Sequence, residues 1–196
     1  DLPGAFSLKG GGILENLTDS LTRSGTIGLD MVTRNLNFLT GLTGVTPDGS
    51  LVIPDSMSLK MKMEMNGPQY KAKLDLKEGK GSMNVNAALN SSTEVYTADL
   101  KINDLQLHHF LPKDSIYELS LSADAKGRGL DVMSFHSLAN LNLSLDQLHY
   151  ARYHLSNVHL TGNLKGALAT AQLTSDNELL KMTADAEYNL AHSYPD

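Results

Sequence analysis

The sequence predicts an all-β fold: an elongated, curved antiparallel sheet with one continuous apolar face, similar to a β-taco. Long runs alternate apolar and polar residues with a period of two, the period of a strand with one wet face. Short breaks rich in Gly, Asn and Ser separate these runs, which favours antiparallel meanders over parallel crossovers. Aromatic residues are only 6% of the 196 and Trp is absent, although β-sandwiches usually fill the space between their sheets with large aromatics. A β-sandwich is the alternative fold.

The clearest predicted strands lie in the first two thirds of the chain. Over residues 57–65, Met and Leu alternate with Ser, Lys and Glu, and Asn66-Gly67-Pro68 then supplies strong turn residues. The alternation resumes over residues 70–77, so the two runs predict a hairpin. Further strands are expected over residues 83–89 and 96–102.

The same pattern recurs in the second half. Residues 119–126 alternate and end at the break Gly127-Arg128-Gly129. Strands are then expected over residues 140–146, 158–164 and 180–190, again with one aliphatic and one polar side.

Three segments depart from the alternation. Between Thr26 and Leu42 the apolar residues recur at helix-like intervals, which is compatible with a helical turn. Between Asp104 and Pro112 the alternation changes phase, which predicts a bulge or a corner. Gly10-Gly11-Gly12 is expected in a turn or bulge, because no strand-to-helix context for a phosphate cradle surrounds it.

These patterns divide the chain into two regions. Residues 1–50 are expected to hold N-terminal strands with a short helical excursion, and residues 51–196 a repetitive antiparallel β segment. The chain starts at Asp1 without an initiator Met and stops just after a patterned run. We therefore expect a fragment of a longer parent.

Composition argues against several classes of function. The chain has 16 Lys and Arg against 22 Asp and Glu, a net charge of −6. This argues against nucleic acid or an anionic membrane surface as the main partner, because both need clustered cations. The absence of Cys excludes a disulfide scaffold, a thiolate zinc site and a Cys nucleophile. No stretch approaches the ~20 apolar residues of a membrane-spanning helix.

No constellation for catalysis emerges. The seven His include the adjacent pair His108-His109 and the evenly spaced His149, His154 and His159. Within one strand, adjacent residues and residues five apart point to opposite faces, so neither set should converge on a metal ion. Gly-x-Ser-x-Gly does not occur, and the carboxylates are dispersed along polar strand faces. We therefore expect no enzymatic activity, no metal site and no cofactor.

The apolar face is the remaining functional candidate. In two packed sheets its residues would form a dry core, whereas in a single curved sheet they would form a trough for acyl chains, and the residues alone leave both open. Aliphatic side chains and flexible Met suit irregular or fluid apolar partners. The predicted lining residues share one phase of the alternation: Met57, Leu59, Met61, Met63, Met65, Leu74, Leu76, Leu119, Leu121, Leu141, Leu143, Leu145, Leu180, Met182 and Tyr188.

The sequence also resembles the TamB/AsmA-like family of Gram-negative envelope proteins, in the long β-rich region of TamB. The resemblance rests on residues 100–112 (LKINDLQLHHFLP), 125–131 (AKGRGLD), 150–166 and 174–177 (TSDN). It covers roughly Ser50 to the C-terminus. These motifs are degenerate, so what the resemblance carries over is an architecture and no catalytic residue.

The resemblance implies a periplasmic segment of a protein anchored in the inner membrane. Its apolar groove would conduct phospholipid between the inner and outer membranes, or support outer-membrane protein translocation and assembly. It also implies an outer-membrane barrel partner of the TamA type, bound through parts of the parent outside this sequence. The alternative from another class is a compact β-sandwich adhesion or interaction module.

Overall fold

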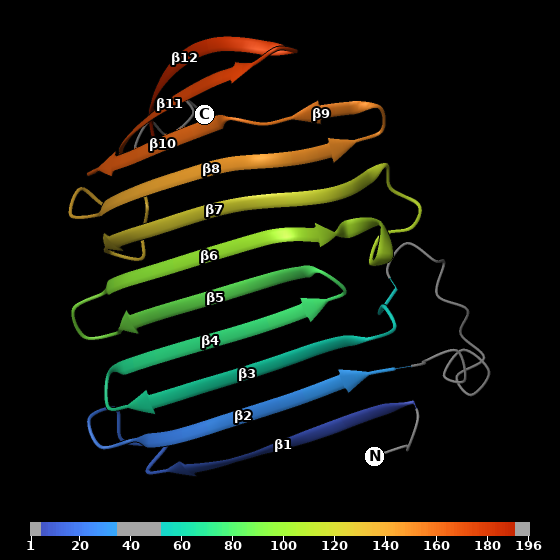
Figure 1. Ribbon diagram of the computed structural model, residues 1–196. Helices are drawn as coiled ribbons and strands as arrows, with labels where there is room; N and C mark the ends of the chain where they lie inside the picture. The colour runs from blue at the N-terminus through green and yellow to red at the C-terminus, as the bar shows by residue number, and fades with distance from the viewer. Residues whose placement is uncertain (1–4, 35–51, 191–196) are drawn as a thin grey trace, which may run out of the picture.

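A computed structural model describes residues 5–34 and 52–190, and every strand in them belongs to one antiparallel sheet. The sheet is open, which confirms the predicted fold class, and the strands of these two ranges do not form the alternative β-sandwich (Figure 1). The strands are β1 (Phe6–Glu15), β2 (Ser24–Thr33), β3 (Met57–Asn66), β4 (Gln69–Glu78), β5 (Gly81–Asn90), β6 (Val95–Gln106), β7 (Ile116–Arg128), β8 (Leu138–Tyr150), β9 (Tyr153–Leu155), β10 (Val158–Lys165), β11 (Leu168–Asn177) and β12 (Leu180–Asn189).

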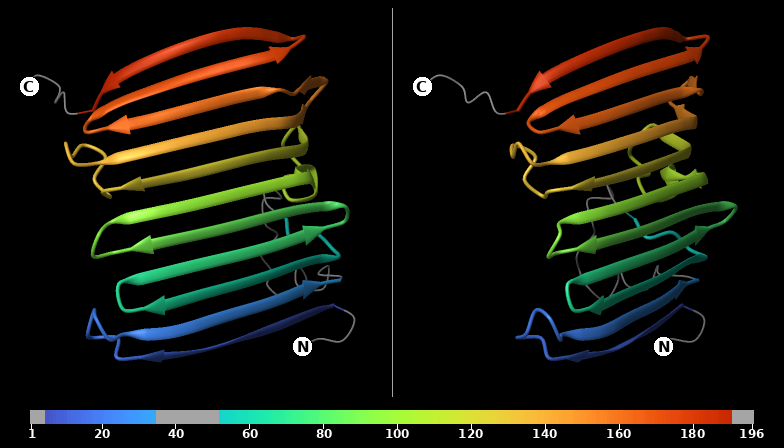
Figure 2. Two further views of the ribbon diagram at one scale, coloured as in Figure 1. Left: turned by 60° about the vertical axis from the view of Figure 1, so that its left-hand side comes forward. Right: turned by 90° about the vertical axis from the view of Figure 1, so that its left-hand side faces the viewer.

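Each strand pairs with the next strand in the chain, except that β8 pairs with both β9 and β10. The order runs from β1 to β8 and then through β10 to β12, while the short β9 pairs with the end of β8 beside β10. β1 and β12 therefore lie at opposite edges, as the views in Figures 1 and 2 show. Eleven strand positions at a spacing of about 4.8 Å give a sheet about 48 Å across.

The predicted hairpin is confirmed. β3 pairs with β4 from Met57 opposite Glu78 to Asn66 opposite Gln69. The turn residue Gly67 has a φ of 54°, a left-handed conformation that Gly adopts without a steric penalty.

The phase change predicted between Asp104 and Pro112 begins with a β-bulge. The register between β6 and β7 shifts between Ile102 and Leu105, and Asp104 has a φ of 47°. The backbone N–H of Asp104 donates to Ser120 Oγ at 2.8 Å, which fixes the extra residue. Because a bulge inserts one residue, Ile102 and Leu105 stay on the same face although they are three apart.

Two expectations for the N-terminal region are wrong. Residues 26–33, where a helical turn was expected, lie in β2; the rest of that expectation falls on residues outside the described ranges. β2 pairs with β3 almost along its full length, so its alternating Ile27, Leu29 and Met31 join the rows of the sheet. Gly10-Gly11-Gly12 lies in the middle of β1 and forms no turn. Because β2 pairs with β3, the sheet continues from the predicted N-terminal region, residues 1–50, into the predicted region of residues 51–196.

One end of the apolar face is covered. Met57, Leu76, Ile102 and Leu105 form the buried cluster of the sheet. Leu107, in the 3-10 helix η1 (Leu107–His109), and the nearby Phe110 pack against it. Within the described residues, no helix has the length and apolarity to cross a membrane.

Candidate functional site: an apolar sheet face

The strand register aligns apolar side chains into rows that cross the sheet at right angles to the strands. One row starts with Met31 in β2 opposite Leu59 in β3 and passes through every strand position to β10. Its members are Met31, Leu59, Leu76, Met83, Ile102, Leu121, Leu145 and Val158. The next row comprises Leu29, Met61, Leu74, Val85, Leu100, Ala123, Leu143, Leu160 and Leu173.

All of the predicted lining residues fall on this one face. The bulge at Asp104, and a second register shift between Ser120 and Leu121, keep the β6, β7 and β8 residues in phase. Burial differs along the strands, however. Met57 and Leu76 are 5% and 8% exposed, whereas Met63 is 46% exposed and Leu141 37%. The face therefore has a covered end next to η1 and an open part beyond it.

The open part contains a row of small residues that the sequence analysis missed. Ala72, Ala87, Ala98 and Ala125 lie directly opposite one another in β4, β5, β6 and β7. On one side of them stand Leu74, Val85 and Leu100, and on the other Tyr70, Leu89 and Tyr96. The flanking rows are four residues apart along each strand, about 14 Å. The alanines therefore form the floor of a furrow between two walls of larger side chains.

The furrow deepens into a hollow of about 470 Å³ over β1 to β6. Its lining includes Met63, Tyr70, Ala87, Leu89 and Tyr96, and Leu130 from the loop after β7 also reaches it. The lining residues predicted from the sequence do not include Tyr70, Tyr96 or the alanines of the furrow. The sequence shows that these tyrosines and alanines share the apolar phase of their strands. Only the pairing register shows that they lie side by side across the strands.

The opposite face is polar and carries charges of both signs. Lys60 lies 3.8 Å from Asp30, and Lys73 3.7 Å from Asp75. Asn84 Nδ2 donates to Asp75 Oδ1 at 2.7 Å. The side chains of the two ion pairs are largely exposed, so this face is a solvated surface and the pairs contribute little to stability.

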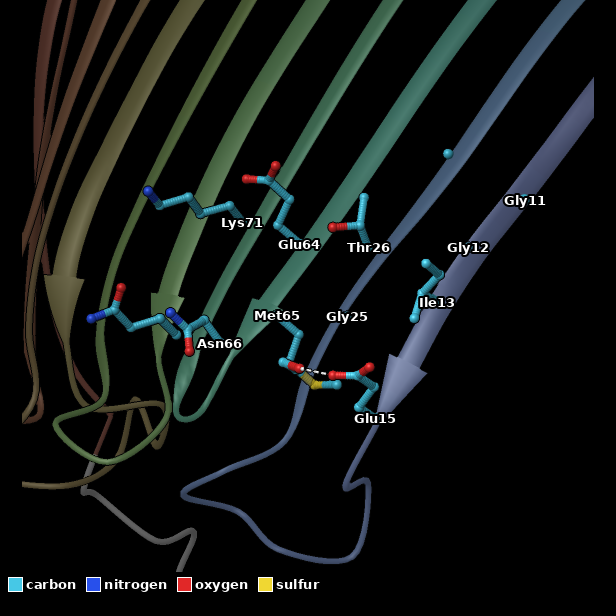
Figure 3. Close-up of a pocket in the computed structure, with 13 residues that line it drawn as sticks. Gly11, Gly12, Ile13, Glu15, Gly25, Thr26, Glu64, Met65, Asn66 and Lys71 are labelled. Carbon is cyan, nitrogen blue, oxygen red and sulfur yellow. Dashed lines mark hydrogen bonds between the residues drawn. The ribbon is translucent and has the colours of Figure 1, made fainter.

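The polar face also has a hollow, of about 930 Å³, over β1 to β4 (Figure 3). Gly11 and Gly28 lie opposite each other there, and nothing lies within 4 Å of a Cβ placed on Gly11. Its charged side chains include the cross-strand partners Glu64 and Lys71. Glu15 also lines the hollow, so its charged groups are two carboxylates and one ammonium, and Lys71 offsets only one of the carboxylates.

The histidines are arranged differently from the expectation. His149 and His154 lie in a hairpin, not in one strand, and pair directly with ring centroids 4.1 Å apart. His108 and His109, expected to diverge, also lie with ring centroids 4.1 Å apart, because they are in η1. Nevertheless, no three or more His, Asp or Glu of the described residues are placed to hold a metal ion.

The 3-10 helix is tied to the sheet through a buried carboxylate. His109 Nδ1 lies 2.7 Å from Glu78 Oε1, and the Glu78 side chain is nearly inaccessible to solvent. The second oxygen, Oε2, is buried without a hydrogen-bond partner. This contact holds η1 over the covered end of the apolar face.

Comparisons with protein-family models, with curated proteins and with solved structures give no match for this chain.

Proposed function

We propose that this chain is a non-enzymatic segment of a periplasm-spanning TamB/AsmA-like protein. Its apolar face holds the acyl chains of phospholipids in transit between the inner and outer membranes, and through this it supports outer-membrane protein assembly. In this proposal the parent is anchored in the inner membrane and meets an outer-membrane barrel protein of the TamA type through segments outside this sequence.

The observation that carries the proposal is an apolar face left open over much of its area. Within residues 5–34 and 52–190 no second sheet packs on it, so Met63, Leu141 and Met182 remain more than a third exposed. Large contiguous apolar surfaces on soluble domains usually mark binding sites. A β-sandwich module would bury these side chains, so the alternative adhesion function lacks its structural premise.

The furrow supports an acyl chain as the ligand. It is floored by alanine and walled by Leu, Val and the rings of Tyr, so it offers mainly apolar dispersion contacts on three sides. The furrow crosses the strands. Beyond Ala125 its row passes through the larger Leu141 in β8 and continues with Gly162, Ala171 and Ala186 in β10, β11 and β12. A ligand moving along the row therefore meets only apolar side chains or glycine, although Leu141 interrupts the floor of small residues.

A pair of adjacent alanines in β5 provides the test. Ala87 forms the furrow floor, opposite Ala72 and Ala98, while Ala88 points to the polar face, opposite Lys71 and Thr97. Ala87→Phe should block the furrow and lower the affinity for a fluorescent acyl-chain phospholipid at least tenfold. Ala88→Phe adds the same volume to the same strand and should leave the affinity unchanged.

Both variants should keep a cooperative melt, because both alanines are partly accessible. Equal affinities of folded Ala87→Phe and wild-type protein would refute acyl binding in the furrow. The same would follow if both variants lost affinity equally, since that would show a global effect.

A further inference from the structure

The floor of the furrow holds one large side chain between two stretches of small residues. The first stretch comprises the alanines of β4 to β7, which are Ala72, Ala87, Ala98 and Ala125. The second lies in β10 to β12 and comprises Gly162, Ala171 and Ala186. Leu141 in β8 separates them, directly opposite Ala125 on one side and Gly162 on the other.

Leu141 forms a step in this floor. Its side chain branches beyond Cβ, whereas Ala125 ends at Cβ and Gly162 has no side chain. A Cβ placed on Gly162 would lie 3.6 Å from Leu141 Cβ and 3.9 Å from Leu141 Cδ2. The isobutyl group therefore stands beside the vacant position on Gly162. Leu141 is 37% exposed, so a ligand on the floor can reach it.

The hollow of about 470 Å³ ends before this step. Of the described residues, none in β7 to β12 lines it, and Leu130 from the loop after β7 completes its lining. Tyr96 occupies the space over Gly127 in β7, because a Cβ placed on Gly127 would collide with the Tyr96 ring. The side of the furrow next to this loop is therefore filled at β7.

The other side of the furrow is closed as well. Ala123 lowers the wall there, since it stands in β7 between Leu100 and Leu143. However, Leu121, the next residue of the apolar phase, packs against the buried cluster at the covered end. A chain lying on the alanines therefore meets Leu141 ahead and filled space on both sides.

We propose that Leu141 is the stop that limits the length of acyl chain held in the furrow, with the terminal methyl group of the chain against its side chain. This inference rests on the proposed function, because it concerns the chain bound there. The four alanines cover four strand widths, about 19 Å. An extended acyl chain advances about 1.3 Å per carbon, given C–C bonds of about 1.5 Å. About 15 carbons therefore lie between Leu141 and Met63, the large residue at the other end of the alanines.

Affinity should accordingly depend on chain length in two phases. Until the chain fills the alanine floor, each added methylene is buried and raises the affinity, by up to about fourfold when burial is complete. In a longer chain the further methylenes must rise over Leu141 toward solvent, so they add little.

Two leucines of β8 provide a matched pair of variants. Leu141→Ala joins the two stretches of small residues into one floor. Leu143→Ala removes the same atoms from the same strand, but from the wall row, where Leu143 lies opposite Ala123. Both side chains are partly accessible, so both variants should fold. The probes are lysophosphatidylcholines from decanoyl to arachidoyl, kept below their micelle concentrations, which displace a fluorescent acyl-chain phospholipid.

In the wild-type protein we expect the arachidoyl lipid to bind about as tightly as the palmitoyl lipid. Leu141→Ala should raise the arachidoyl-to-palmitoyl affinity ratio at least tenfold, because about four more methylenes gain burial at about twofold each. Leu143→Ala should lower the affinity for every length and leave this ratio unchanged. A wild-type ratio in folded Leu141→Ala, or an equal rise in Leu143→Ala, would overturn the proposal.

Ala125→Leu tests the stop in the opposite direction. It places a large side chain one strand nearer, which shortens the floor by about four carbons. The affinity should then stop rising near the lauroyl lipid, and an unshortened limit in the folded variant would also overturn the proposal. Binding of the shorter lipids by the wild-type protein tests the proposed function itself. If they bind and the limit does not move, the stop alone is refuted, whereas a wild-type protein that binds no lipid of any length would refute both.

Discussion

The two ends of the apolar face should respond very differently to the loss of a side chain. Ile102 lies in the covered cluster and is 8% exposed, whereas Leu141 lies in the open part and is 37% exposed. Ile→Ala and Leu→Ala each remove the equivalent of three methylene groups. At about 0.8 kcal/mol for each fully buried group, the transfer contribution is about 2.2 kcal/mol at Ile102 and about 1.5 kcal/mol at Leu141.

A cavity penalty applies only at the covered site. Ile102 packs among Met57, Leu76 and Leu105, so its truncation leaves an enclosed void and the total loss should reach about 3–4 kcal/mol. Solvent fills the space left at Leu141, so its loss should stay near 1.5 kcal/mol. Urea unfolding of lipid-free protein, followed by circular dichroism, measures both values. Equal losses of 3 kcal/mol or more would refute the reasoning, because they would show that another layer covers Leu141.

Three further changes test local features. Thr33→Val leaves the N–H of Met57 without its buried acceptor, Thr33 Oγ1 at 3.0 Å, and should lower the free energy of unfolding by about 1–3 kcal/mol; an unchanged urea midpoint would contradict this. The hydrogen bond from Lys62 lowers the pKa of Glu64 below its ordinary value of 4.5, so the stability that Glu64 contributes is present above that value and lost as the pH falls through the lowered one. Lys62→Met should raise this pKa in an NMR titration, and an unmoved titration would exclude Lys62 as the cause. Gly79→Ala, at a φ of 55° with open space around it, should cost about 1–2 kcal/mol from backbone strain alone; no loss in urea unfolding would contradict a strained turn.

The sequence predicted most strands because their side chains obey a simple alternation. β3, β4, β5 and β6 were all expected within a few residues of their bounds, since each has one wet and one apolar side. N-terminal strands were expected within residues 1–50, but the bounds of β1 could not be given because Gly10, Gly11 and Gly12 supply no side chains to alternate. β11 was missed because small and polar residues dilute its apolar phase.

Features that depend on register could not be predicted in the same way. The alanine furrow requires knowing that Ala72, Ala87 and Ala98 are opposite one another. The histidine analysis went wrong for a related reason. It assumed one strand from His149 to His154, whereas Ala151, with a φ of 52°, turns the chain into a hairpin.

The central claim, an acyl-binding furrow on an open sheet face, is tested most directly by native mass spectrometry with lipid extraction on protein purified without detergent. The account predicts phospholipid bound to the wild-type chain and to Ala88→Phe, and its loss from Ala87→Phe. A lipid-free wild-type chain that also takes up no phospholipid from added vesicles would contradict it.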